Sequence, residues 1–315
     1  MDSPQLPPVV AILGPTASGK SAAAMVVAKH FDCEIISVDS AQVYRSMDIG
    51  TAKPNALQRQ EVAHHLLDIR DPHESYSAAD FSADAHSLVT QIHKRGRVPL
   101  LVGGTMLYFR AFAYGLSDLP AANTPLRSEL DLLAAQIGAR AMHDRLAQVD
   151  PQAASRIHPN DPQRVQRALE IYYATGRTRS DWCAQGPAQA SPFCIARFVL
   201  APQRRSWLHD RIADRFDQML ALGLLDEVAR LRTDPRLSLH NPALRAVGYR
   251  QLWQYLEGDI DFADACNRAV TATRQLAKRQ FTWLRREREA QWFNSEDPRA
   301  LELLLQSIAR VIHRE

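Results

Sequence analysis

Apolar stretches of five or six residues recur along the first third of the chain and return once in its second half. Between them lie segments rich in helix-favouring residues, such as the Ala-rich stretch 21–29 and residues 77–95, which open with a Ser-x-x-Asp capping pattern at Ser77. The apolar stretches, which we interpret as strands, are residues 9–13, 34–38, 98–102 and 195–200. Strands that alternate with helices are typical of a parallel sheet, so the sequence predicts an α/β fold with helices flanking the sheet.

A different pattern covers the middle of the chain. Residues 116–192 read as helices separated by breaks that contain Pro or Gly, including a helix that begins after Asp161 and ends at Gly176. Beyond the last predicted strand the chain is almost entirely helical, and residues 261–288 are its most distinctive helical stretch. The predicted organisation is a core in two parts, residues 1–115 and 195–315, and a helical insertion domain at residues 116–194.

Composition is that of an ordinary globular protein. The 315 residues are 46% hydrophobic and 23% charged, and the net charge is only +3, so any nucleic-acid-binding surface has to be local. The four cysteines are too widely spaced for a Cys-x-x-Cys pair and are interpreted as buried thiols in a reducing cytosol. No secretion signal is apparent at the start, and no apolar run approaches membrane-spanning length. We therefore expect a cytoplasmic protein without a membrane partner.

A phosphate-binding loop follows the first predicted strand. The sequence fits the P-loop pattern Gly-x-x-x-x-Gly-Lys-Ser, with a strand before it and a helix after it, and so indicates a P-loop NTPase-like core. Its glycines let backbone N–H groups approach phosphate oxygens, while Lys20 supplies a charge and Ser21 a hydroxyl for a metal ion. The residues predicted to bind a diphosphate or nucleotide are Gly14, Pro15, Thr16, Ala17, Ser18, Gly19, Lys20 and Ser21.

The next two strands predict further polar groups at the same edge of the sheet. Asp39 directly follows the strand at 34–38, and Thr105 follows the strand after it. The carboxyl ends of parallel strands meet at the edge where α/β sheets bind ligands, so both residues are expected near the phosphate loop. Asp39 is a candidate general base, and its neighbours Ser40 and Gln42 are candidates for reading a nucleobase edge. A simple acidic cap at the strand end is the alternative for Asp39.

Kinase or ATPase chemistry is the default expectation for a phosphate loop. Such enzymes usually close a neighbouring strand with an acidic residue that holds magnesium through water. Here the strand at 98–102 runs into Gly103-Gly104-Thr105, without a carboxylate. This departure weakens the default.

Seven motifs in one order make the sequence resemble the tRNA dimethylallyltransferases. The resemblance spans nearly the whole chain except residues 179–192. The motifs are GPTASGKS (14–21), DSAQVYR (39–45), DIGTAKP (48–54), VGGTMLY (102–108), NDPQRVQRALE (160–170), RAVGYRQ (245–251) and KRQFTWLR (278–285). The resemblance implies transfer of a dimethylallyl group from its diphosphate to the amine of the adenine immediately 3′ of a tRNA anticodon, with Mg²⁺.

The resemblance also implies roles for individual residues. Asp39 would accept the proton of the adenine amine, and Thr105 would help to hold the reacting groups. Lys20 and a magnesium ion at Ser21 would stabilise the diphosphate as it leaves. Arg215 resembles the diphosphate-contacting arginine of the family, and Arg211 is the alternative.

A basic helical segment predicts where RNA binds. Residues 268–288 contain seven basic residues and one acidic residue, and Arg274, Lys278 and Arg285 share a face opposite an apolar stripe. A merely solvated charged face is the alternative. By resemblance, the anticodon stem-loop is contacted by Asp39, Ser40, Ala41, Gln42, Thr105, Arg127, Gln163, Arg164, Val165, Gln166, Arg167, Arg245, Ala246, Val247, Gly248, Tyr249, Arg250, Lys278, Arg279, Gln280, Phe281, Thr282, Trp283, Leu284 and Arg285. The insertion would then clamp the stem-loop.

Three other functions share part of this pattern. A kinase of a nucleotide or small metabolite would have the same loop and fold, but it would need its own metal carboxylate. A prenyltransferase acting on a free adenine nucleotide would not need the insertion or the basic helix. An RNA-binding switch gated by a nucleotide would not need Asp39. The partners that the resemblance implies are dimethylallyl diphosphate and tRNA, and we expect the protein to be a monomer.

Overall fold

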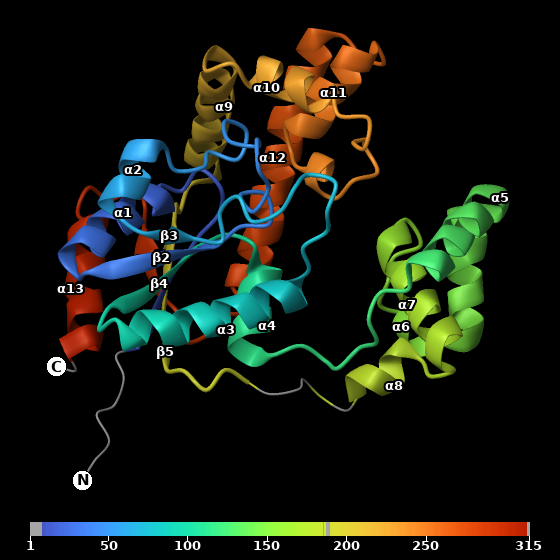
Figure 1. Ribbon diagram of the computed structural model, residues 1–315, viewed down its shortest axis with the longest axis horizontal. Helices are drawn as coiled ribbons and strands as arrows, with labels where there is room; N and C mark the ends of the chain where they lie inside the picture. Colours follow the sequence, from blue (N-terminus) through green and yellow to red (C-terminus); the bar gives the residue numbers. More distant parts are fainter. Residues whose placement is uncertain (1–7, 185, 187–189, 314–315) are drawn as a thin grey trace. The chain divides into compact units, whose positions relative to one another are not determined.

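The computed structural model describes residues 8–184, 186 and 190–313, which form two compact units. One unit consists of the residues up to Ala113 and from Ser191 onward, and the other of residues Tyr114–Ala190. The boundaries of the second unit lie within a few residues of the predicted insertion, 116–194. Figure 1 shows the elements of both units.

A parallel sheet of six strands forms the centre of the first unit. The strands are β1 (Val9–Leu13), β2 (Cys33–Val38), β3 (His64–His65), β4 (Val98–Gly103), β5 (Ile195–Ala201) and β6 (Gln291–Asn294). Their order in the sheet is β3-β2-β4-β1-β5-β6, and all five pairings are parallel. β1, β2 and β4 are buried along their whole length. β1 and β4 are accordingly continuous apolar runs, whereas β2 also buries Glu34 and Ser37. The predicted P-loop NTPase-like fold is thereby confirmed.

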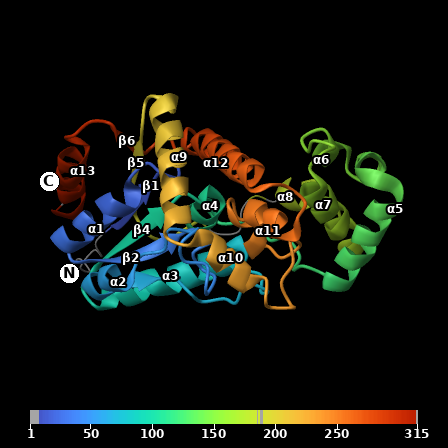
Figure 2. The same cartoon turned by 90° about the horizontal axis from the view of Figure 1, so that it is seen from above.

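Helices cover both faces of this sheet (Figure 1). The first three are α1 (Lys20–His30), α3 (Ala78–Lys94) and α13 (Ala300–His313). The connection from β1 to β2 runs across the sheet in one direction and that from β2 to β4 in the other, so right-handed crossovers place α1 and α3 on opposite faces. α13 lies beside α1, and the two pack on Val10, Ile12 and Leu100 of the sheet (Figure 2).

The first unit contains six more helices and one 3₁₀ turn among its described residues. They are α2 (Ala56–Glu61), α4 (Met106–Tyr114), α9 (Arg205–Ala221), α10 (Leu224–Leu231), the 3₁₀ turn η1 (Ala243–Arg245), α11 (Tyr249–Glu257) and α12 (Phe262–Leu284). α12 packs on α9 through an apolar cluster that includes Leu208, Ile212 and Ala277, with Val270 and Phe281 at its border. The predicted apolar stripe of this helix is thus confirmed.

The described residues of the second unit form helices and connecting loops, without a strand. Its helices are α5 (Thr124–Val149), α6 (Pro151–Ala154), α7 (Pro162–Thr175) and α8 (Arg179–Ala184). α5 is interrupted at Gly138, whose φ of +81° is not helical. Asp161 caps α7 by accepting the Arg164 N–H, and Gly176 ends it in the left-handed region, as predicted. Leu130, Leu146 and Leu169 belong to the separate core of this unit.

Two strands were not predicted, and one helix is shorter than predicted. β3 and β6 contain two and four residues, too few to show a periodic pattern. The helix expected over residues 261–288 ends at Leu284, after which Glu287 is buried and accepts a hydrogen bond from Arg110 (2.8 Å). This long-range ion pair holds the turn that leads into β6. In the described part of the chain, no helix has both the length and the apolar character needed to span a membrane.

Candidate active site

Three loops meet at the carboxyl edge of the sheet, as the strand ends predict. The N–H of Gly14 donates to the carbonyl of Gly103 (3.3 Å), which ties the end of β1 to the end of β4. The N–H of Ser40, after β2, donates to Oγ1 of Thr105, after β4 (3.1 Å). A hydrogen bond from the Thr105 N–H to the carbonyl of Val38 (3.1 Å) closes the group. The phosphate loop, Asp39 and Thr105 therefore share one edge.

The phosphate loop has the backbone that its glycines require. Gly19 opens α1 with a φ of +92°, a conformation in which a side chain is strained. A Cβ on Gly14 would lie 2.3 Å from the carbonyl oxygen of Leu200 in the adjacent strand, so this position admits only glycine. Lys20 is half-buried and donates from Nζ to the carbonyl of Pro15 (3.2 Å). The lysine amine is therefore folded back onto the loop that would hold a phosphate.

Gln280 of α12 joins this loop to the end of β4. Its Oε1 accepts the N–H of Thr16 (2.8 Å), and its Nε2 donates to the carbonyl of Gly104 (3.0 Å). A Cβ on Gly104 would lie 2.3 Å from that Nε2, which explains the second glycine of Gly103-Gly104. The sequence predicted that Gln280 contacts RNA; the structure instead shows its amide engaged in holding the site together.

Two arginines from α9 reach the phosphate loop. Arg211 donates from Nε to the carbonyl of Ala17 (3.0 Å), and its guanidinium lies over the ring of Trp207, 4.8 Å from the centroid. Arg215 donates from Nη1 to Oγ1 of Thr16 (3.2 Å). Both candidates for a diphosphate-contacting arginine thus bind the loop itself, one turn apart on the same helix.

The electrostatics of this edge concern three groups. Burial and the charge of Arg215 lower the pKa of Lys20 to about 8, against an opposing effect of Asp39. Burial also lowers the pKa of Arg215, and again the charge of Asp39 opposes the shift. Two cations are therefore held close together with one carboxylate nearby. A polyanion placed on the loop would relieve this repulsion between cations.

Proton uptake is an expected consequence for ligand binding. Lys20, with a pKa of about 8, is charged below pH 8 and neutral above it, and a bound diphosphate favours the charged form. Binding of a diphosphate ligand at pH 8 should therefore take up about half a proton, and the affinity for this ligand should fall as the pH rises further. Calorimetric titration in two buffers of different ionisation enthalpy measures this uptake. Lys20→Arg is the control, since arginine stays charged; an equal uptake in that variant would assign the proton elsewhere.

Asp39 is held in place through one of its carboxylate oxygens. Oδ1 accepts the N–H groups of Ala41 (2.8 Å) and Gln42 (3.3 Å). The Gln42 side chain accepts from Ser37 Oγ (2.8 Å) and donates to the carbonyl of Thr51 (3.1 Å). The sequence offered Gln42 as a reader of a nucleobase edge, which stays a prediction; in this structure its amide supports the loop beside Asp39.

A divalent cation in this site would need oxygen ligands from the substrate as well as from the protein. Ser21 lies in the first turn of α1 with its side chain exposed. Among the described residues there is no group of three or more His, Cys, Asp or Glu that could hold a metal ion. Mg²⁺ keeps several waters and is commonly bound by one or two protein oxygens together with phosphate oxygens. The Ser21 hydroxyl fits that pattern.

The predicted RNA-binding residues of the first unit differ in exposure. The exposed ones are Ser40, Arg245, Arg250, Lys278, Arg279, Thr282 and Arg285; the half-buried ones are Asp39, Ala41, Gln42, Thr105, Ala246, Val247, Gln280, Phe281 and Trp283; and the buried ones are Gly248, Tyr249 and Leu284. The side chains of Tyr249 and Leu284 are buried in this structure, and Gly248 offers only backbone atoms, so the contacts of these three residues with RNA stay predictions. Arg274 is also half-buried, and its Nε is buried without a partner, so it does not belong to the exposed stripe.

In the second unit, two of the arginines predicted to bind RNA form ion pairs with one buried carboxylate. Arg127 and Arg167 pair with Glu170, at 3.1 and 2.8 Å. Burial alone would raise the pKa of Glu170, but the hydrogen bonds from these arginines and from the Asn123 N–H lower it. The two arginines therefore stabilise a buried charge. This ion pairing was not foreseen from sequence.

The other predicted residues of this unit lie along α7. Gln166 donates to Asp131 Oδ1 (2.7 Å), and Val165 is buried in the core of the unit. Gln163 and Arg164 are exposed, and Arg164 pairs loosely with Asp161 (3.3 Å). Only the last two therefore present polar groups to solvent at the start of the helix.

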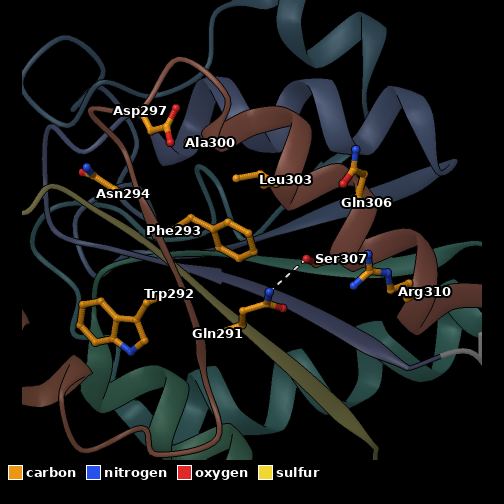
Figure 3. Close-up of a pocket in the computed structure, with 10 residues that line it drawn as sticks. All are labelled: Gln291, Trp292, Phe293, Asn294, Asp297, Ala300, Leu303, Gln306, Ser307 and Arg310. Atoms are coloured by element: carbon orange, nitrogen blue, oxygen red, sulfur yellow. Dashed lines mark hydrogen bonds between the residues drawn. The ribbon is translucent and has the colours of Figure 1, made fainter.

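A cavity of about 280 Å³ lies elsewhere in the first unit, between β6 and α13 (Figure 3). Its lining includes Phe293 and Leu303, and a hydrogen bond from Gln291 to Ser307 (3.1 Å) crosses it. β6 is an edge strand at the opposite side of the sheet from β2. None of its lining residues was predicted as a site residue, and we assign the cavity no part in the reaction.

Comparison with known proteins identifies the family. The family model described as IPP transferase matches residues 42–287, well over half of the chain. A tRNA dimethylallyltransferase of Alkalilimnicola ehrlichii is 56% identical over 94% of this chain and 93% of its own. One from Methylococcus capsulatus is 53% identical over 95% of this chain and 96% of its own.

Solved structures agree with this result. The tRNA isopentenylpyrophosphate transferase of Bacillus halodurans is 39% identical, has a TM-score of 0.71, and aligns over 98% of this chain and 97% of its own. A eukaryotic dimethylallyltransferase described as acting on tRNA is 28% identical, with a TM-score of 0.77 over 96% of this chain and 77% of its own. The chain therefore belongs to the IPP transferase family, the family of the tRNA dimethylallyltransferases.

Proposed function

We propose that the protein transfers a dimethylallyl group from dimethylallyl diphosphate to the N6 amine of adenine 37, immediately 3′ of the anticodon in tRNA, and releases diphosphate. The observation that carries the proposal is the pairing of a cation-rich phosphate loop with Asp39 at one sheet edge. Lys20, Arg211 and Arg215 can neutralise a diphosphate, while β4 ends without the carboxylate typical of ATP hydrolysis. Family membership supports the same activity.

The leaving group determines what the loop has to do. As the bond between the allylic carbon and its diphosphate oxygen breaks, negative charge collects on the diphosphate and positive character on the allyl group. Contacts with the phosphate loop position Lys20 and Arg215, which would stabilise the negative charge on the diphosphate. Mg²⁺, bound with the diphosphate at Ser21, would supply further positive charge to the leaving group.

The amine that attacks must lose a proton. Its nitrogen forms the new bond to the allylic carbon, and we assign the departing proton to the Asp39 carboxylate, which then releases it to solvent. Oδ1 of Asp39 is fixed by two backbone N–H groups, so the carboxylate has a defined orientation. Thr105, bonded to Ser40 and Val38, is the neighbouring group that would hold the adenine against it.

The acceptor has to be presented as an unstacked base, because its amine is inaccessible within a stacked loop. The exposed cations Arg250, Lys278, Arg279 and Arg285 in the first unit are proposed to bind the phosphate backbone near the site. Gln163 and Arg164 of the helical second unit are proposed to contact the stem, which makes that unit a clamp. Because all candidate reacting groups come from one chain, the proposal requires only a monomer.

A single assay tests the function. The protein is incubated with tRNA, magnesium and dimethylallyl diphosphate, and the tRNA is digested and analysed by mass spectrometry. We expect one adenine, at position 37, to gain a dimethylallyl group without any requirement for ATP. Equal transfer to free adenosine monophosphate would favour the nucleotide prenyltransferase instead, and ATP-dependent phosphate release without RNA would favour a kinase or ATPase.

Salt dependence tests the proposed RNA surface. Lys278→Ala combined with Arg285→Ala should weaken tRNA binding and lower the slope of log K against log salt by about 0.7 for each RNA phosphate that the protein no longer neutralises. The affinity for dimethylallyl diphosphate should stay the same. Arg268→Ala is the matched control on the same helix, because Arg268 is neutralised by Asp264 (2.7 Å). If the double variant keeps the wild-type slope, the stripe is only solvated surface.

A further inference from the structure

Glu227 is a buried carboxylate on α10 that none of the proposed chemistry uses. Its Oε2 accepts the N–H groups of Asp48 (3.0 Å) and Ile49 (2.9 Å), and its Oε1 accepts the N–H of Gly50 (3.2 Å). Oε1 also accepts the Tyr249 hydroxyl (2.5 Å). The carboxylate therefore binds three successive N–H groups of a loop that lies almost 180 residues away in sequence.

All four groups that contact Glu227 are hydrogen-bond donors, which are the partners that a carboxylate needs. A buried carboxylate is tolerated only when its oxygens are satisfied, and here four donors converge on it. Burial and the nearby charge of Glu227 raise the pKa of Tyr249, so the phenol remains a donor. Gly50 has no room for a Cβ, which would lie 2.4 Å from the Tyr249 ring. The ring and the carboxylate together fix the backbone of this loop.

A buried cation holds the other end of the same loop. The Lys53 side chain is 1% exposed, and its Nζ donates to the Tyr44 carbonyl (2.7 Å), Asp48 Oδ1 (2.6 Å) and Asp68 Oδ1 (2.6 Å). Asp48 thus gives its N–H to Glu227 and its side chain to Lys53. The loop is clamped between two buried charges of opposite sign.

The clamped loop is connected to the proposed general base. The Gln42 side chain donates to the carbonyls of Thr51 (3.1 Å) and Ala52 (3.3 Å) in this loop, and it accepts from Ser37 Oγ. The backbone N–H of the same Gln42 donates to Asp39 Oδ1. A shift of the loop would therefore move Gln42, and a shift of Gln42 would reorient the Asp39 carboxylate.

We propose that Glu227 is a positioning residue for prenyl transfer, acting through the loop and Gln42 on the orientation of Asp39. The inference rests on the proposed function, in which Asp39 takes the proton. It also gives Tyr249 a role as one of the four donors to Glu227, in place of the contact with RNA that the sequence suggested. The phosphate loop belongs to β1 and α1, so binding of dimethylallyl diphosphate is not expected to depend on Glu227.

A double-mutant cycle on the full chain tests the proposal. Glu227→Gln keeps the shape but replaces the anion, and it should lower kcat about 10- to 100-fold, because small displacements of a reacting group have effects of that size. KM for dimethylallyl diphosphate should change by no more than about threefold. The decisive comparison is with Asp39→Asn: the double variant should be no more than about threefold slower than Asp39→Asn alone, since both changes impair the same group.

Glu34→Gln is the matched control, because Glu34 is as buried as Glu227. Glu34 lies near the start of β2, whereas Asp39 follows its end, about 16 Å away along the strand. It should lower the melting temperature and leave kcat unchanged. If Glu227→Gln does not fold, Tyr249→Phe takes its place in the cycle. Tyr249→Phe removes one of the donors to Glu227 and should also lower kcat. Effects of Glu227→Gln and Asp39→Asn that multiply, or a fall in kcat matched by Glu34→Gln, would overturn the proposal. An inactive wild-type protein would instead overturn the proposed function.

Discussion

Asp39→Asn is expected to lower kcat by about 10²- to 10⁴-fold, the usual contribution of a positioned acid or base, while tRNA and dimethylallyl diphosphate binding change only a few-fold. Asparagine preserves the shape of the side chain and can still accept the N–H groups of Ala41 and Gln42 through its carbonyl oxygen. It cannot take a proton from the amine. Single-turnover rates with saturating substrates, together with separate binding measurements, distinguish the two effects.

Asp32→Asn provides the control for this comparison. Asp32 precedes the same strand, β2, at its other end, and its side chain forms an exposed ion pair with Arg97 (3.4 Å). Its replacement should leave kcat unchanged. If Asp39→Asn abolishes binding as well as turnover, the carboxylate organises the site rather than accepting the proton; an unchanged rate would place the base elsewhere.

Lys20→Ala should reduce kcat by at least about 10²- to 10³-fold. The expected reduction follows from the leaving group: removal of one preorganised charge from a developing anion costs roughly 3–4 kcal/mol, and each ~1.4 kcal/mol is a factor of ten in rate. Affinity for the diphosphate should also fall, because the same amine faces the ground-state substrate. Rates and affinities measured below pH 8, where Lys20 is charged, give the full effect.

Lys29→Ala separates this effect from the stability of α1. Lys29 lies in the last turn of that helix, and its amine pairs at the surface with Glu61 (2.7 Å). The variant should turn over at the wild-type rate. A folded Lys20→Ala protein with near-normal turnover would contradict the assignment of the loop to the diphosphate.

Local patterns allowed much of the fold and part of the site to be predicted. A strand buried on both faces is a continuous apolar run, and its carboxyl end fixes where the next residue lies. This is why the bounds of β1 and the adjacency of Asp39, Thr105 and the phosphate loop could be derived from the sequence. The N-cap of α7 at Asp161 follows from equally local chemistry.

Pairings between distant residues could not be predicted in the same way. A basic residue shows its charge in the sequence but not its partner, so Arg127 and Arg167 were assigned to RNA although both pair with buried Glu170. Likewise, neither the bridge made by Gln280 nor the carboxylate of Glu227 leaves a periodic signal. The roles of these residues follow only from the three-dimensional arrangement.

The Gln280 bridge has a consequence for the order in which the protein matures. The chain is made from its N-terminus, so the phosphate loop leaves the ribosome 264 residues before the amide that bonds to Thr16. Arg211 and Arg215 follow the loop by nearly 200 residues. A nascent or truncated chain that ends before α12 therefore carries the loop without the bridge to β4. We expect such a chain to bind dimethylallyl diphosphate poorly, so that an incomplete enzyme would not sequester the substrate.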